Sequence, residues 1–173
     1  MRRPLENEYP DYYKAYIDLV QDDNAIKFLE AQILNIQSFI SEIEEFEDYS
    51  YLPGKWTIKE VIGHLTDAER VFGYRAMRFA RSDNSALPGF DENSYVAAAN
   101  FSQRTLHDIS HEFSMMRHAN LHLFRSFTSE QLDSSGIANN QKISVRSIVF
   151  ATAGHVEHHV NVIKKRYLTA VLK

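Results

Sequence analysis

Three of the eight histidines in this chain combine a spacing and a position that suit metal binding. His155 and His159 form an H-x-x-x-H pair, and residues four apart share one face of a helix, where two imidazoles can grip one ion. His64 lies on a separate predicted helix. Three neutral imidazoles leave coordination positions open for water or substrate, as in catalytic zinc sites. The sequence therefore predicts one divalent metal ion bound by His64, His155 and His159.

The apolar residues of each predicted helix indicate which histidines face the core. In the segment from about 144 to 168, His155 and His159 fall about 40° apart at the edge of the buried wedge. His158 lies about 100° from His159 and outside that wedge. His64 lies at the margin of the core side of its own helix. A lone histidine there is more often a hydrogen-bonded core residue, but three from two helices favour a ligand set.

A second group of histidines lies in the segment from about 102 to 127, where two pairs also have the i,i+4 spacing. The group forms a stripe about 60° wide around the helix. The large apolar residues of the same segment centre on the opposite side, so we expect the stripe to face water. Its members are His107, His111, His118 and His122.

Four charged residues near the predicted site have candidate supporting roles. Arg75 lies eleven residues, or about 16 Å, beyond His64; it could bind an anionic part of a substrate or form a structural salt bridge. Asp67 and Glu69 could orient an imidazole through a hydrogen bond, or pair between helices. Asp91 follows a Pro-Gly turn and could line the mouth of a pocket or cap a short helix.

Four long segments with few helix breakers can form the helices that position these residues. They span about 22–47, 57–81, 102–127 and 144–168. The first carries isoleucine and leucine at spacings of three and four, and the second opens with Thr57 and Glu60 in a capping-box pattern. Only 49–52 and 141–144 are candidates for short extended segments. The pattern predicts an all-α fold.

The lengths of these segments favour an antiparallel four-helix bundle in a single domain, 1–173. Two long connections, 82–101 and 128–143, join the helices. The first 21 residues are rich in tyrosine, and we expect them to form a short extra helix on the outside of the bundle.

Composition narrows the classes of function. With 19 Lys and Arg against 23 Asp and Glu, the net charge is -4, which gives no long-range attraction to nucleic acid or to anionic lipid. The chain contains no cysteine, so disulfides and thiolate nucleophiles of its own are excluded and any metal is held by nitrogen or oxygen. No secretory leader or membrane span is apparent, and we expect a cytoplasmic protein.

The ordered combination of three segments resembles the DinB/YfiT-like family of metal-dependent enzymes. The segments are Pro53 to Arg70, containing PGKWTIKE and GHLTDAER, Leu87 to Asn93, LPGFDEN, and Ala153 to His159, AGHVEHH. The resemblance spans nearly the whole chain. It implies a four-helix bundle and a metal, often nickel or zinc, on one histidine of the second helix and the H-x-x-x-H pair of the fourth. Here these correspond to His64, His155 and His159.

The resemblance also implies frequent homodimers and, among relatives, transferases or isomerases that use a low-molecular-weight thiol, alongside hydrolases. Our first hypothesis is an enzyme whose metal activates water or the thiol of a small co-substrate. The absence of cysteine is consistent with a thiol supplied from outside. The second hypothesis is a non-catalytic metal- or ligand-binding dimer, for instance in a stress response. A third is a bundle without a metal.

Overall fold

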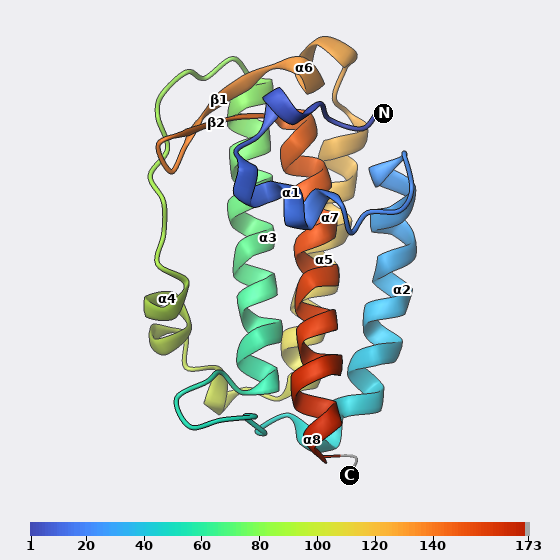
Figure 1. The fold of residues 1–173 in the computed structure, drawn as a ribbon, viewed down its shortest axis with the longest axis vertical. Coiled ribbons are helices and arrows are strands. Elements are labelled where there is room, and N and C mark those ends of the chain that lie inside the picture. Colours follow the sequence, from blue (N-terminus) through green and yellow to red (C-terminus); the bar gives the residue numbers. More distant parts are fainter. Residues whose placement is uncertain (172–173) are drawn as a thin grey trace.

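Four long helices form a bundle in the computed structural model, which describes residues 1–171 (Figure 1). They are α2 (Ala25–Ile43), α3 (Ile58–Ala80), α5 (Leu106–Arg125) and α7 (Val145–Val162). Each lies within one of the four predicted segments, so the prediction of an all-α four-helix bundle is confirmed. No helix within residues 1–171 is long and apolar enough to cross a membrane.

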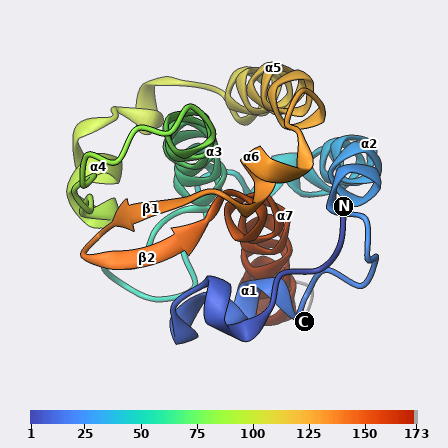
Figure 2. The same ribbon diagram turned by 90° about the horizontal axis from the view of Figure 1, so that it is seen from above.

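The four helices follow one another around a square in the order α3, α5, α2, α7 (Figure 2). In Figure 1, α2 and α7 run downward and α3 and α5 run upward. The predicted antiparallel packing therefore holds for α3 with α7 and for α2 with α5, while α3 and α5 are parallel neighbours. Long connections make this possible, because the chain can return along the bundle before the next helix begins.

Apolar stripes on the helices meet in the interior. In α2 the buried side chains include Leu29, Ile33, Ile36 and Ile40, which recur at spacings of three and four. The predicted capping box opens α3: the Thr57 hydroxyl accepts from the backbone N–H of Glu60 at 3.3 Å, and the Thr57 N–H donates to the Glu60 carboxylate at 2.7 Å. Both reciprocal bonds satisfy backbone donors that a helix start leaves free.

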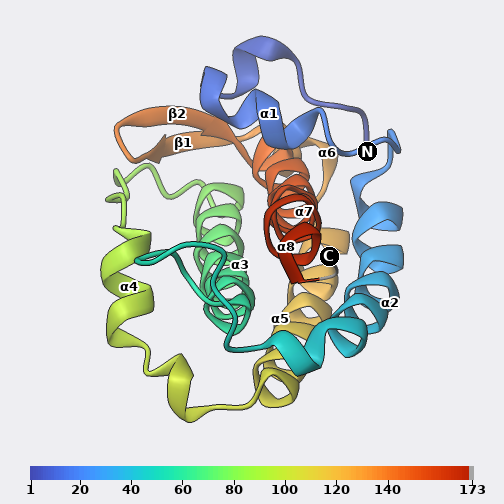
Figure 3. The ribbon, with the colours of Figure 1, turned by 60° about the horizontal axis from the view of Figure 1, so that its bottom comes forward.

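The connection from α3 to α5 descends along the outside of α3 and carries the short helix α4 (Glu92–Ala98), as Figures 1 and 3 show. Near its start, the Leu87 N–H donates to Ile137 O at 2.9 Å and the Asn139 N–H donates to Leu87 O at 3.0 Å. These bonds fix the first part of the connection against a hairpin at the end of the bundle.

The sequence predicted an extended segment for only one of the two strands of that hairpin. It consists of β1 (Ser135–Ala138) and β2 (Gln141–Ser144), and it follows the short helix α6 (Ser129–Asp133). The two-residue turn, Asn139 and Asn140, has positive φ at both positions, which asparagine tolerates and tight hairpins require. The segment 141–144 is extended as predicted, whereas 49–52 lies in an irregular loop.

The N-terminal segment crosses α7 on the outside of the bundle, as predicted, and contains the one-turn helix α1 (Lys14–Ile17) (Figure 1). Gly154 permits this contact, because a Cβ at that position would lie 1.9 Å from the backbone oxygen of Tyr16. Tyr13, Ile17 and Val20 of the segment are themselves buried.

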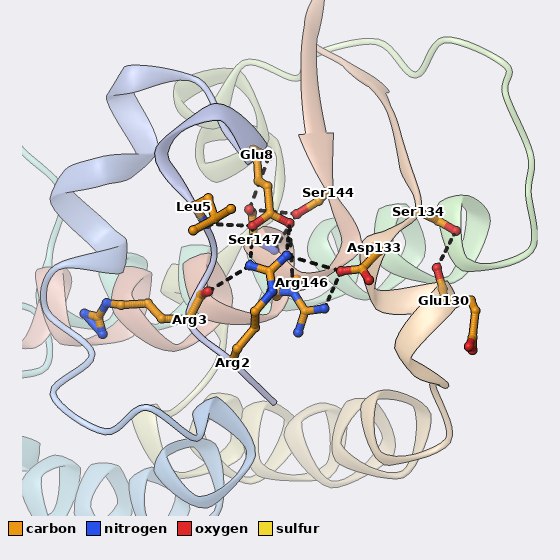
Figure 4. A network of polar contacts seen from close by, with 10 residues as sticks. All are labelled: Arg2, Arg3, Leu5, Glu8, Glu130, Asp133, Ser134, Ser144, Arg146 and Ser147. Atoms are coloured by element: carbon orange, nitrogen blue, oxygen red, sulfur yellow. Dashed lines mark hydrogen bonds and ion pairs between the residues drawn. The ribbon is translucent and has the colours of Figure 1, made fainter.

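A polar network holds the N-terminal segment in place (Figure 4). Arg146, buried at the start of α7, forms ion pairs with Asp133 of α6 and Glu8 of the N-terminal segment. Arg2 donates to Glu8 at 2.6 Å and to Asp133 at 3.3 Å. The network joins three segments that are distant in sequence and keeps the tyrosine-rich segment over α7.

Candidate metal centre

The Nε2 atoms of three histidines converge between α3 and α7. The distance from His64 Nε2 to His155 Nε2 is 3.1 Å, and that from His159 Nε2 to His155 Nε2 is 3.2 Å. One ring nitrogen from each of the three residues lies within 4.8 Å of the others. With ligand bonds of about 2.0 to 2.1 Å, neighbouring ligand atoms around an ion are about 2.9 to 3.4 Å apart. The two short distances match that spacing.

The antiparallel contact of α3 with α7 brings the histidines together. His64 lies in the second turn of α3, and His155 and His159 lie one turn apart in α7. A glycine precedes the first histidine of each helix. A Cβ at Gly63 would lie 2.4 Å from the Phe101 ring, and Gly154 has the contact with Tyr16 described above. The repeated Gly-His pair is a local sequence signal of this close packing.

Burial keeps these imidazoles neutral. It lowers the pKa of His64 to about 4 and that of His159 to about 3. Burial, and then the neighbouring histidines, lower the pKa of His155 well below its usual value. Neutral imidazole is the form that binds a metal through its lone pair.

The proton inventory of the three rings fits a cation. A neutral imidazole has one N–H, so the His155 Nε2 can donate to only one of its two neighbours. No carboxylate belongs to the converging set among the described residues. One divalent ion would satisfy all three lone pairs, and three imidazoles suit several first-row metals.

Aromatic side chains surround the cluster. The Trp56 ring centre lies 4.9 Å from that of His64, and the Tyr16 and Phe72 ring centres lie 5.4 and 5.6 Å from that of His155. Tyr167, in a π-helical segment, Ile163–Leu168, that continues α7, donates a hydrogen bond of 2.8 Å to the Trp56 carbonyl. This bond holds the loop that carries the indole against the histidines.

Two cavities reach the cluster. The Trp56 cavity, of about 340 Å³, is lined by Trp56, His158 and His159, and by Lys55 and Arg166. The tyrosine cavity, of about 160 Å³, is lined by His64 and His155. Its other lining residues include three tyrosines and several polar side chains: Tyr12, Tyr13, Tyr16, Arg75, Glu92 and Asn139. The cluster therefore lies at the border of two chemically different spaces.

The other histidines are placed largely as expected. The four of α5, namely His107, His111, His118 and His122, are exposed. His158 does not belong to the converging set, but it is half-buried, lines the Trp56 cavity and has its ring centre 5.1 Å from that of His159. His158 therefore lies nearer to the site than its position outside the buried side of the predicted helix indicated.

The acidic residues expected to orient an imidazole have other partners. Glu69 accepts two hydrogen bonds from Arg117 of α5, at 2.7 and 2.9 Å. Asp67 pairs with Arg70 at 3.4 Å, and burial raises the pKa of Asp67. The supporting role proposed for Glu69 is wrong, because its carboxylate binds α5 rather than the histidines; the open alternative of inter-helix pairing holds.

The two residues considered for substrate binding differ. Asp91 caps α4, accepting from the backbone N–H groups of Asn93 and Ser94 at 3.0 and 3.3 Å. It lines neither of the two cavities, although the adjacent Glu92 lines the tyrosine cavity. Arg75 lines the tyrosine cavity with His64 and His155. The three tyrosines, Trp56 and Asn139 are further lining residues that sequence reasoning did not identify.

Comparisons with known proteins bear on the family and the fold of this chain. The model of the DinB superfamily matches residues 30–163. The chain is 30% identical over 120 residues to an Oceanobacillus iheyensis protein named "Putative metal-dependent hydrolase", across 66% of each chain, and so spans just under two thirds of that relative's length. The fold of the present chain is similar to that of YfiT from Bacillus subtilis, which is described as a probable metal-dependent hydrolase with an unusual four-helix bundle topology.

The likeness to YfiT has a TM-score of 0.68 at 16% identity and covers 94% of this chain and 89% of the other. At that identity it concerns the fold. The family match includes all three converging histidines and more than half of the chain. This chain therefore belongs to the DinB superfamily.

Proposed function

We propose that this protein is a metal-dependent enzyme in which His64, His155 and His159 bind one divalent ion, nickel or zinc. Held by these three residues, the ion would supply the Lewis acidity that activates a small nucleophile, water or a low-molecular-weight thiol, toward a small electrophilic substrate. One observation carries the proposal: three imidazoles converge, two of their Nε2 distances match ligand spacing, and each of two cavities is lined by members of the set.

The chain's own residues define the chemistry available there. A bound divalent ion supplies Lewis acidity and lowers the pKa of a nucleophile that binds to it. Three protein ligands leave positions open for such a nucleophile. Trp56, Phe72 and Tyr16 shield the rings from bulk water, and fewer waters near the ion strengthen its electrostatic effect.

Two nucleophiles are consistent with this arrangement. The names of the two relatives support water, hence hydrolysis. The presence of two cavities supports transfer between two substrates, because a thiol and its acceptor can approach the cluster from different sides. An external thiol is also consistent with a chain that has no cysteine.

Metal analysis tests the ligand set. Untagged protein is stripped with a chelator, loaded with zinc or nickel, and analysed by mass spectrometry of the metal content. We expect one ion per chain in the wild type, and its loss in His155→Ala and His159→Ala. His111→Ala, an exposed histidine of α5, is the matched control and retains the ion. Substoichiometric metal in the wild type would contradict the proposal.

Activity assays then separate the nucleophiles. The metal-loaded protein is assayed with ester substrates, and with common small thiols together with chlorinated or epoxide acceptors. We expect turnover that disappears in His155→Ala. Stoichiometric metal without turnover in either assay would instead favour a non-catalytic binding protein.

We further propose that the enzyme is a homodimer in the cytoplasm. Sedimentation velocity tests the homodimer. We expect one species with twice the mass of the chain at all protein concentrations. A monomer at all concentrations contradicts it.

A further inference from the structure

Arg75 differs from the other buried cations of the described residues in having no carboxylate partner. The buried basic side chains are Lys59, Arg75, Arg117 and Arg146. The other three form ion pairs with acidic residues: Lys59 with Glu47 and Asp48, Arg117 with Glu69, and Arg146 with Glu8 and Asp133. The Arg75 side chain is 6% exposed, and within residues 1–171 it forms no ion pair.

The guanidinium of Arg75 has unused donors. Its Nη2 donates to the carbonyl of Pro88 at 3.0 Å, the one hydrogen bond recorded for this side chain among the described residues. A guanidinium carries five N–H donors in a planar fork. Among the described residues the fully buried side-chain nitrogens without a partner belong to Arg78 and Arg146, so the other nitrogen atoms of Arg75 keep some accessible surface. They are therefore available to a ligand in the cavities that Arg75 lines.

The position of Arg75 links the metal centre to a larger space. It lines the tyrosine cavity together with His64 and His155. It also lines a third cavity of about 570 Å³, here called the Tyr74 cavity, which is walled by Tyr74, Phe90 and Tyr95. Arg75, Gly89 and Phe90 are common to both linings. A molecule bound at Arg75 can therefore extend toward the histidines on one side and toward the aromatic wall on the other.

The nearby charges leave the guanidinium without compensation. Arg70 and Arg78 also line the Tyr74 cavity, but each is paired with an acidic residue. Glu92 lines the tyrosine cavity, yet it is exposed and forms no recorded ion pair with Arg75. A largely buried charge without a counterion is costly, and the planar fork matches the two oxygens of a carboxylate or phosphate.

We propose that Arg75 binds the anionic group of the substrate, a carboxylate or a phosphate, and so makes the enzyme selective for small organic anions. Arg75 and His64 are eleven residues, or about 16 Å, apart along α3. The anionic group is therefore several bonds from the reacting atom and does not bind the metal. Tyr13 and Tyr16 line the same cavity as Arg75, and a tyrosine hydroxyl can donate a hydrogen bond to an anion.

Binding of anions to metal-free protein tests the Arg75 site by itself. Chelator-treated protein is titrated by calorimetry with inorganic phosphate and, separately, with pentanoate. We expect 1:1 binding of at least one anion, weakened at least tenfold in Arg75→Met and partly retained in Arg75→Lys. Arg125→Met, which removes an arginine of α5 that is paired with Glu30 and lines neither cavity, is the matched control and stays within twofold of the wild type. The anion that binds identifies the group recognised.

Stability distinguishes a binding role from a structural one. Because Arg75 lacks a counterion, Arg75→Met is expected to unfold at the same or a higher urea concentration than the wild type. A lower midpoint in Arg75→Met, no binding of either anion to the wild type, or unchanged binding in Arg75→Met would each overturn the proposal.

The link to catalysis rests on the proposed function. With metal-loaded protein, kcat/KM for the p-nitrophenyl half-ester of glutaric acid should fall at least tenfold in Arg75→Met. The value for p-nitrophenyl pentanoate, an uncharged ester of the same chain length, should stay within twofold. An equal fall for both esters contradicts the selectivity. A wild type that binds anions but hydrolyses neither ester counts against water as the nucleophile and leaves the anion site supported.

Discussion

Two of the polar clusters buried within residues 1–171 share helix α3, and they differ in whether their hydrogen bonds are complete. In the first, Arg117 donates to both carboxylate oxygens of Glu69 and to the side-chain oxygen of Gln32, and Asn120 donates to Glu69. Every partner is protein. In the second, three neutral imidazoles turn their Nε2 atoms toward one another.

The difference separates a structural cluster from a functional one. Gln32 also donates to the carbonyl of Ala153 at 3.0 Å, two residues before His155, so the complete cluster positions the helix that carries the incomplete one. α3 contributes Glu69 to one and His64 to the other. A complete cluster should be sensitive to loss of a partner, whereas the incomplete one should respond to an added cation.

The largest expected effect is on the complete cluster. Glu69→Ala leaves the guanidinium of Arg117, which is fully buried, without its counterion, and should lower the free energy of unfolding by roughly 3 to 5 kcal/mol. Urea unfolding of metal-free protein measures this. The double variant Glu69→Leu with Arg117→Met removes both charges and should regain most of the loss; a double variant as unstable as the single one contradicts the explanation.

The next effect concerns the histidine cluster. Metal at about a hundredfold above its dissociation constant should stabilise the wild type by about 2.7 kcal/mol. In His155→Ala this increment should vanish. Without metal, the free energies of unfolding of the two proteins should differ by less than this increment. Thermal unfolding with and without zinc checks the prediction. An equal shift in both proteins would mean that the ion binds elsewhere.

Two glycine-to-alanine substitutions test how much added volume is tolerated near each of the two clusters. In Gly154→Ala the new Cβ meets the backbone oxygen of Tyr16 at 1.9 Å, whereas in Gly73→Ala it meets the side-chain oxygen of Asn120 at 2.3 Å. Because backbone moves less readily than a side chain, Gly154→Ala should cost about 1 to 3 kcal/mol and Gly73→Ala less. Denaturation midpoints of both variants decide this, and the reverse order contradicts it.

The smallest effect is expected for the exposed histidines of α5. The double variant His107→Gln with His111→Gln should change stability by less than about 0.5 kcal/mol and leave the metal content unchanged. These residues have the same i,i+4 spacing as His155 and His159, so the variant tests whether spacing or convergence determines binding. A lower metal content would favour spacing.

Much of the fold was predictable because its determinants are local. The apolar spacing of α2 and the Thr57 to Glu60 capping box indicate helices without knowledge of their neighbours. The convergence of His64 with the pair on α7 was a hypothesis from the helical wheel. The structure brings these rings together, while their binding of a metal is still a proposal.

The parts that were missed depend on contacts distant in sequence. A helical wheel gives the buried side of α3 but not the neighbour, so it could not assign Glu69 to Arg117 rather than to a histidine. Tyr16 reaches His155 only through the packing of α1 on α7. The hairpin had a local signal, Asn139 and Asn140, that was not interpreted as a turn.

The contact of Tyr16 with Gly154 also bears on the order of folding. The segment that covers the histidines is synthesised before the four long helices, but its binding surface belongs to the last of them, α7. Closing so long a loop is entropically costly and tends to occur late. The N-terminal segment therefore cannot dock until residue 154 has emerged from the ribosome, and because His155 and His159 follow that residue, the histidine cluster and its cover both form only after the last long helix has been made.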